Sequence, residues 1–181
     1  MPFRRRIRLL SAGAPVNPTA DADYETPMGL AYYNADILRL LVKAGLDVQY
    51  KNKDGETYLA SHGYFETAAR ELLNAGADPN AKDKHGATAL MNASAYGYED
   101  SVKLLIQHGA NVNLTDEKGR TALMYAAEGG FRNEYHIDAI PILLANGADP
   151  DKRDKSGQTA LDIATKLKHM YAIELLKAVK H

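Results

Sequence analysis

Hydrophobic and polar residues alternate along the chain in a pattern that returns about every 33 positions. In each unit, small apolar residues first recur four positions apart, and larger ones such as Val102, Leu105 and Ile106 follow at helical spacing. A spacing of three or four residues places side chains on one face of a helix. The pattern predicts a turn, a short helix, a second helix and a returning loop in each unit. The small pairs are Ala89 and Ala93, Ala122 and Ala126, and Ala160 and Ala164.

Two strings of residues carry this repeat. The first has the form Asp-x-x-Gly-x-Thr-x-Leu and occupies 83–90, 116–123 and 154–161, with weaker copies at 52–59 and 21–28. The second string has two adjacent Leu residues and, three or four positions after them, a Gly. Each of these glycines precedes the next Thr by 12 positions. This constant distance indicates one structural unit repeated along the chain. The threonines are Thr26, Thr57, Thr88, Thr121 and Thr159, and the glycines are Gly45, Gly76, Gly109 and Gly147.

These strings resemble ankyrin repeats, whose unit is about 33 residues with a Thr-Pro-Leu-His-x-Ala signature. The segment from Thr26 to Ala31 is the nearest copy, although every unit lacks the usual His. The resemblance implies an all-α solenoid of about five and a half helix-turn-helix repeats with hairpin-like turns, forming a single domain over 1–181. The expected units are an N-terminal half-repeat cap (1–20), repeats at 21–51, 52–82, 83–115 and 116–153, and a C-terminal capping repeat (154–181).

Local chemistry supports this frame. Thr at the start of a helix accepts a hydrogen bond from an N–H group of the first turn, and Gly is favoured just past a helix end. Relative to the 33-residue frame, the first two full units lack two residues, which we expect to shorten the turn between their helices. The fourth unit has an insertion at 129–137. Since Pro141 is tolerated only in a first helical turn, the next helix should start near Asp138.

The first residues mix arginines at positions 4, 5, 6 and 8 with Phe3, Ile7, Leu9 and Leu10. Terminal repeats need a polar outer face, so this pattern favours a cap. A phosphate or membrane contact is the alternative interpretation of the arginines.

Composition narrows the function classes. Of the 181 residues, 45% are hydrophobic and 25% are charged, and the formal net charge is −1, which argues against a disordered chain and a general nucleic-acid binder. No run approaches the roughly 18 apolar residues of a membrane span. The chain has no Cys, and its six His form no ligand pair. No metal, cofactor or catalytic residue is predicted, and we expect no enzyme.

A binding role then remains, and the tyrosines are the best indication of where a partner binds. The chain has 11 Tyr, 3 Phe and no Trp, and Tyr is enriched among the residues that dominate binding energy at interfaces. In ankyrin arrays, the concave face consists of the turn tips and the exposed side of the first helices. Transferring that geometry gives these candidate partner-binding residues: Tyr33, Tyr64, Tyr96, Lys84, His85, Arg120, Tyr125, Glu128, Phe131, Arg132, Tyr135 and His136.

The resemblance therefore predicts a non-catalytic protein–protein interaction module that acts through its concave face and the 129–137 insertion. The preferred specific function is a stand-alone binder or inhibitor of a partner protein, of an immunity or self-protection type, as in short bacterial ankyrin proteins. The alternatives are a scaffold or adaptor fragment of a larger ankyrin protein and, less favoured, a small-ligand binder or enzyme. The expected partner is another protein, not nucleic acid or membrane, and the free chain should be monomeric. Cytoplasmic location is slightly favoured over a periplasmic one.

Overall fold

A computed structural model describes residues 16–17, 34–52, 55–129 and 139–178. Its first described helix is α2 (Ala35–Lys43). Four helix pairs follow: α3 (Tyr58–His62) with α4 (Glu66–Asn74), α5 (Ala89–Tyr96) with α6 (Glu99–Gln107), α7 (Ala122–Glu128) with α8 (Ala139–Ala145), and α9 (Ala160–Leu167) with α10 (Met170–Lys177). Within these ranges, extended pairing is limited to isolated bridges between Lys51 and Thr57 and between Lys82 and Thr88. The predicted all-α architecture is confirmed.

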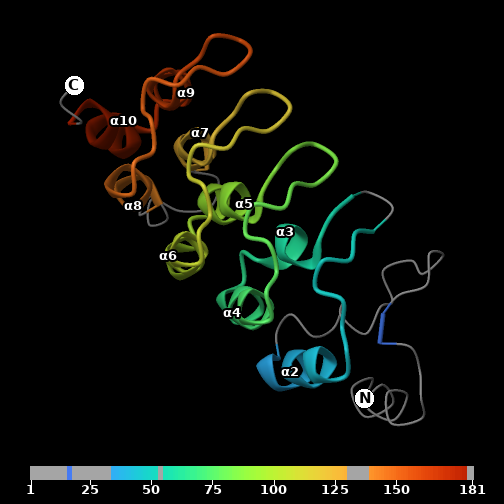
Figure 1. Cartoon of the computed structure of the whole chain (residues 1–181). Helices are drawn as coiled ribbons and strands as arrows, with labels where there is room; N and C mark the ends of the chain where they lie inside the picture. Colours follow the sequence, from blue (N-terminus) through green and yellow to red (C-terminus); the bar gives the residue numbers. More distant parts are fainter. Residues whose placement is uncertain (1–15, 18–33, 53–54, 130–138, 179–181) are drawn as a thin grey trace.

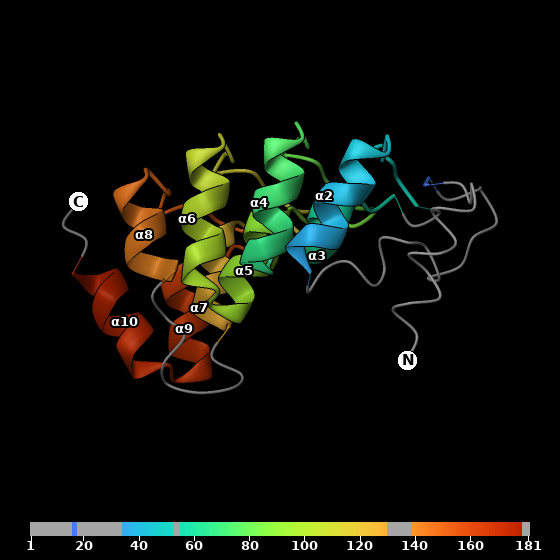
Figure 2. The ribbon, with the colours of Figure 1, turned by 90° about the horizontal axis from the view of Figure 1, so that it is seen from below.

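The helices form two layers that run along the array (Figure 1). One layer contains α3, α5, α7 and α9, which lie beside the hairpin loops, and the other contains α2, α4, α6, α8 and α10. Figure 2 shows α2, α4, α6 and α8 side by side. Each helix of the four pairs therefore packs against its own partner and against its neighbours in the same layer, so the core is continuous along the described array.

Threonine side chains start the helices of the inner layer. The hydroxyl oxygens of Thr57, Thr88, Thr121 and Thr159 each accept a hydrogen bond from an N–H group of the first turn, at 3.1–3.4 Å. Behind these caps, alanines such as Ala93 and Ala164 are fully buried. Small side chains allow neighbouring inner helices to approach closely, while Leu72, Leu105 and Leu143 of the outer layer fill the space between the layers.

The hairpins are held by aspartates and by contacts from one hairpin to the next. The Asp83 carboxylate accepts bonds from the N–H groups of His85 and Ala87, both at 2.8 Å, and Asp116 and Asp154 do the same in the following hairpins. The N–H of Glu117 donates to the carbonyl of His85 at 2.9 Å. Successive hairpins are thus joined by backbone bonds and form one connected edge.

A second set of bonds joins the loops that follow the outer helices. In four successive units, the side-chain amide of Asn17, Gln49, Asn80 or Asn113 donates to the carbonyl of the next loop glycine. The oxygen of the same amide accepts an N–H two residues beyond that glycine. The four residues are spaced 31–33 positions apart in the sequence. Each of them therefore fixes its unit to the following one, in register with the repeat.

The structure departs from one local expectation and agrees with the placement of Pro141 in a first helical turn. The missing residues of the second full unit shorten the first helix, not the turn: α3 has five residues where α5 has eight, and three residues separate α3 from α4. The expectation of a shorter turn was wrong: Tyr64 and Phe65 of that turn are partly buried against the hydrophobic core, and the shortening falls on the helix end instead. Pro141 is the third residue of α8, as its missing N–H requires. Asp138, residues 21–33 of the first full unit, and all of the N-terminal half-repeat except residues 16–17 lie outside the described residues.

Candidate protein-interaction surface

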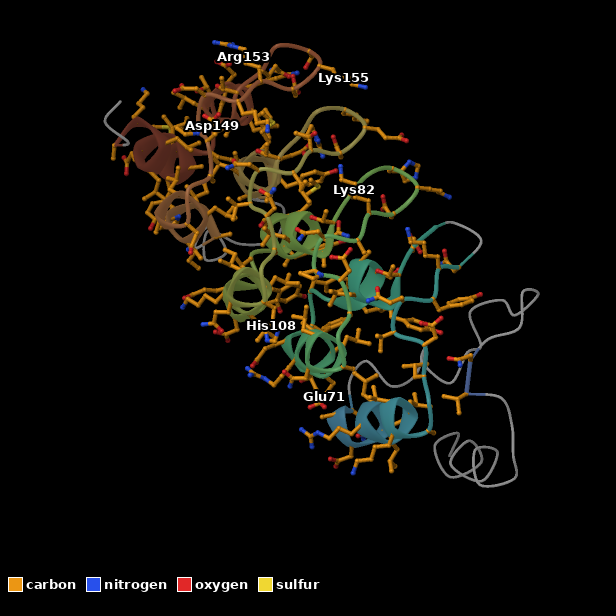
Figure 3. The ribbon with its side chains drawn as sticks, viewed as in Figure 1. Glu71, Lys82, His108, Asp149, Arg153 and Lys155 are labelled. Atoms are coloured by element: carbon orange, nitrogen blue, oxygen red, sulfur yellow. The ribbon has the colours of Figure 1, made fainter. Side chains whose placement is uncertain are left out.

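The structure places seven of the twelve candidate binding residues. Lys84 and His85 are exposed at the tip of the hairpin before α5, and Tyr96 is exposed at the end of that helix. Figure 3 shows Lys82, Arg153 and Lys155 on the same hairpin side and Glu71 on the outer layer. The remaining five candidates, Tyr33, Phe131, Arg132, Tyr135 and His136, lie outside the described residues.

Tyr64 and Tyr96 meet in an aromatic cluster that also contains Phe65 and Tyr98. The ring centroids of Tyr64 and Tyr96 are 5.4 Å apart, and those of Tyr64 and Tyr98 are 5.8 Å apart with near-parallel planes. Phe65 lies 4.4 Å from Tyr64 and 6.2 Å from Tyr98. These separations are typical of favourable aromatic pairs. The stacking of two repeats thus brings Tyr64 of one unit into contact with Tyr96 of the next.

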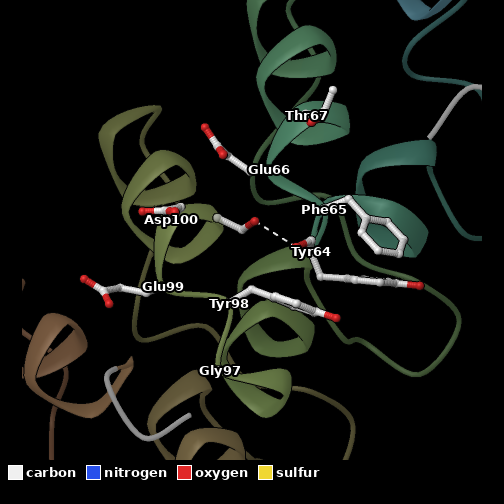
Figure 4. A pocket seen from close by; sticks show the side chains of 9 residues that line it. Tyr64, Phe65, Glu66, Thr67, Gly97, Tyr98, Glu99 and Asp100 are labelled. Carbon is white, nitrogen blue, oxygen red and sulfur yellow. Dashed lines mark hydrogen bonds between the residues drawn. The ribbon is translucent and has the colours of Figure 1, made fainter. Parts of the chain in front are cut away.

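Two helix–helix turns position the aromatic cluster. Tyr64 and Phe65 lie between α3 and α4, whereas Tyr96 ends α5 and Tyr98 directly precedes α6. The hydroxyl of Ser101, in the first turn of α6, donates to the carbonyl of Tyr64 at 2.8 Å, which fixes the start of α6 against the turn between α3 and α4 (Figure 4). Tyr96 and Tyr98 keep 57% and 40% of their surface exposed. The cluster thus combines fixed geometry with accessible ring surface.

Tyr98 and Phe65 were missed in the sequence analysis. Both directly precede an outer helix, and both stand 11 positions before the loop glycine of their own repeat, Gly76 for Phe65 and Gly109 for Tyr98. This shared register was the available signal, but it falls one or two residues beyond the positions that supplied the tyrosine candidates.

The aromatic cluster borders His62, the last residue of α3. The imidazole ring lies 6.3 Å from the Tyr64 ring, and the two planes are nearly parallel. Desolvation by burial lowers the pKa of His62 to about 4, because burial disfavours the charged imidazolium. His62 is therefore neutral at neutral pH, and the surface beside the rings carries no imidazolium charge.

A second group brings together three further candidates, Arg120, Tyr125 and Glu128. The guanidinium of Arg120 lies over the Tyr125 ring, 4.1 Å from its centroid, and a guanidinium nitrogen is 2.5 Å from the Glu128 carboxylate. The Tyr125 hydroxyl donates to the buried Asp116 at 2.9 Å. Tyr125 is half-buried, and its pKa is raised, first by desolvation. These side chains bind one another, so the group forms a fixed polar surface on the inner side of the array.

The described residues hold no group of three or more His, Asp or Glu side chains arranged to hold a metal ion. Within the same part of the chain, every helix is too short or too polar to cross a bilayer.

Comparison with known proteins agrees with the repeat architecture. A family model described as "Ankyrin repeats (3 copies)" matches residues 58–154 and 114–180, which together span more than half of the chain. No curated protein matches the sequence. Ankyrin repeats serve as protein–protein interaction modules and are typically non-catalytic. With its capped helix pairs, connected hairpins and matching family model, the chain belongs to the ankyrin-repeat family.

Proposed function

We propose that the chain binds and inhibits a partner protein as a stand-alone inhibitor of an immunity or self-protection type. The binding surface is the concave face together with the 129–137 insertion. The observation that carries this proposal is the exposed Tyr96 ring, held against Tyr64 by the stacking of two repeats. Exposed, rigidly held tyrosines are typical anchors of protein interfaces, since they bury a large area with little loss of side-chain freedom.

The inner surface is also organised before a partner arrives. Arg120 is fixed by Glu128 and Tyr125, and Tyr125 is fixed by Asp116. A surface that is already ordered loses less entropy on binding, so more of the contact energy appears as affinity. This favours tight binding by a small array, as an inhibitor requires.

The mechanism of inhibition is steric. A repeat array does not deform easily where backbone bonds such as Glu117 N–H to His85 and Lys155 N–H to Lys118 join its hairpins. The tyrosines or the 129–137 insertion occupy the partner's active-site cleft and keep its substrate out, while the charged hairpin tips at Lys84 and Lys155 contact the rim of that cleft.

The test begins with affinity capture from the source cells, after circular dichroism shows that the proteins compared are folded. A variant carrying Tyr96→Ala, Phe131→Ala and Tyr135→Ala is compared with the wild type and with Leu40→Ser. Leu40 is a suitable control because it is exposed on α2, away from the concave face. We expect a partner that the wild type and the control retain and the triple variant loses.

The activity of the purified partner then separates an inhibitor from a scaffold. Stoichiometric loss of activity on adding the wild type, and none on adding the triple variant, is the expected result. Binding with unchanged activity would refute inhibition and support the scaffold alternative. A capture experiment that yields no partner would contradict the protein-binding role itself.

A further inference from the structure

The turns that join α3 to α4, α5 to α6 and α9 to α10 lie along one edge of the array (Figure 2). We call it the helix-turn edge and define it by the contacts that link neighbouring helix pairs there. Ser101 donates to the carbonyl of Tyr64 at 2.8 Å, and a ring nitrogen of His169 lies 3.0 Å from the carbonyl of Ala127. Between them, Gly129 packs so closely on Ala95 that an added Cβ would stand 2.1 Å from the Ala95 carbonyl oxygen. The helix-turn edge is therefore continuous from α3 to α10.

Exposed apolar side chains concentrate on the helix-turn edge. Among the described residues, six large hydrophobic side chains are exposed, and only Leu40 on α2 lies elsewhere. Contiguous exposed apolar surface marks an interaction site more often than scattered single residues do. The five side chains on the edge are Tyr96, Tyr98, Leu167, Met170 and Tyr171.

Carboxylates accompany the aromatic cluster at one end of this edge. A shallow depression of about 340 Å³ is lined by Tyr64, Phe65 and Tyr98 together with Glu66, Glu99 and Asp100, and its nine lining residues include no Lys, Arg or His. Figure 4 shows the rings on one side of the two turns and the carboxylates on the other. A segment lying across the turns would therefore meet aromatic faces first and negative charge next.

The basic residues nearest to these carboxylates stand one turn along each helix. Glu66 pairs with Arg70 at 2.5 Å, and Glu99 pairs with Lys103. Asp100 forms no ion pair among the described residues and is exposed. Ion pairs between exposed side chains are weak and exchange readily, so Glu66 and Glu99 can also contact an incoming cation.

We propose that the aromatic cluster and these three carboxylates dock a partner segment that carries arginine or lysine side chains next to apolar ones. This inference rests on the proposed function, because it names the chemistry that the partner presents to part of the same surface. The exposed faces of Tyr96 and Tyr98 attract a guanidinium or ammonium group through the negative charge of their π-systems. The apolar neighbours of that cation cover the ring edges, and Asp100 complements the charge.

The experiment uses synthetic peptides and the full chain. The probe is a fluorescein-labelled dodecapeptide of alternating Leu and Arg, and the controls replace every Arg with Glu or with Gln. Binding is measured by fluorescence anisotropy at low and high salt. The variants are Tyr96→Ser with Tyr98→Ser, which removes ring surface, and Glu99→Gln with Asp100→Asn, which removes charge. Met170→Ser with Tyr171→Ser is the matched control, because it removes exposed apolar surface from the same edge outside the depression.

We expect the Arg peptide to bind the wild type and the Met170/Tyr171 control equally. Its affinity should fall about tenfold or more in the Tyr96/Tyr98 variant and roughly threefold or more in the Glu99/Asp100 variant, which also loses most of the salt dependence. The proposal would be overturned if the Gln or Glu peptide bound as tightly as the Arg peptide. It would also be overturned if neither cluster variant changed the affinity for the Arg peptide, or if the Met170/Tyr171 control lowered that affinity as much as the cluster variants do.

Two further outcomes are decisive. A dimer in sedimentation experiments that only Tyr96→Ser with Tyr98→Ser dissociates would show that a second copy of the chain covers the cluster, and this would overturn the proposal. If the capture experiment finds a partner but the peptides do not bind, the protein-binding function stands and the cationic docking site fails.

Discussion

The side chain of Asn80 bridges to Gly109 of the following repeat. Its amide nitrogen donates to the Gly109 carbonyl at 3.1 Å, while its oxygen accepts the N–H of Asn111 at 2.8 Å. Because Asn17, Gln49 and Asn113 make the equivalent bonds, this pairing is a repeated connection that sets the register of the array. The stability of a repeat protein is close to a sum of such nearest-neighbour terms.

Asn80→Ala tests this connection. The variant loses both bonds to the next repeat, and we expect the free energy of unfolding to fall by about 1–2 kcal/mol. Urea unfolding followed by circular dichroism gives the value. Asn74→Ala is the control, because Asn74 is exposed at the end of α4. It should leave the free energy of unfolding unchanged. Equal stability of Asn80→Ala and wild type would show that the bonds to Gly109 and Asn111 are replaced by water without loss.

Glycines at two hairpin tips differ in what surrounds them. Gly86 has φ +77°, and an added Cβ would stand 2.9 Å from the Glu117 nitrogen, whereas Gly157 has φ +81° with nothing within 4 Å. Gly157→Ala should therefore lower the free energy of unfolding only through backbone strain, by about 1–2 kcal/mol. Gly86→Ala adds a collision with the next hairpin and should lose about 2–4 kcal/mol in urea unfolding. If both variants lost the same stability, the close packing of hairpins would contribute nothing.

Arg120 should stabilise the fold as well as any interface. Arg120→Ala leaves Asp116 and Glu128 without the guanidinium between them, and we expect a loss of about 1–3 kcal/mol because a buried carboxylate loses its partner. A double-mutant cycle with Glu128→Ala should give a coupling of roughly 0.5–1 kcal/mol. Lys118→Ala, an exposed neighbour in the same hairpin, should be neutral. A coupling of zero would mean that the short contact between Arg120 and Glu128 adds no stability.

His62 should make the fold sensitive to acid. Its pKa is lowered from the ordinary 6.5 to about 4, so the unfolded chain takes up a proton below pH 6.5 while the folded chain does not until about pH 4. Stability is therefore lost as the pH falls through this window. We expect His62 to account for about 1–2 kcal/mol of the free energy of unfolding that is lost over this window. This is less than the full value from the pKa shift, because the side chain is partly exposed.

The measurement is urea unfolding at pH 7, 5 and 4 for the wild type and for His62→Gln. His62→Gln should lose part of the dependence of stability on pH. An unchanged pH dependence in His62→Gln would place the acid sensitivity elsewhere.

Much of the fold could be predicted because it follows from local chemistry. Thr88 and Thr121 cap helices, as their spacing indicated, and Gly86 and Gly119 of the same repeated string adopt positive φ. The connection through Asn80 was harder to see, because it depends on where the next loop lies and because Gln49 replaces Asn in one unit. The contact between Arg120 and Glu128 depends on side-chain rotamers, which no repeat frame specifies. Tyr98 lies in the cluster because of its register directly before α6, whereas the candidates were taken from the ends of the first helices and the hairpin tips.

The most direct test of the account is the affinity of the captured partner, measured by isothermal titration calorimetry. The protein is compared as wild type, as Leu40→Ser and with Tyr96→Ser and Tyr98→Ser combined. Loss of two anchoring rings should weaken binding by about 2 kcal/mol or more, which is roughly thirtyfold, whereas Leu40→Ser should bind as the wild type does. If removing both exposed rings left the affinity unchanged, the partner would bind another face, and the aromatic cluster would not be its anchor.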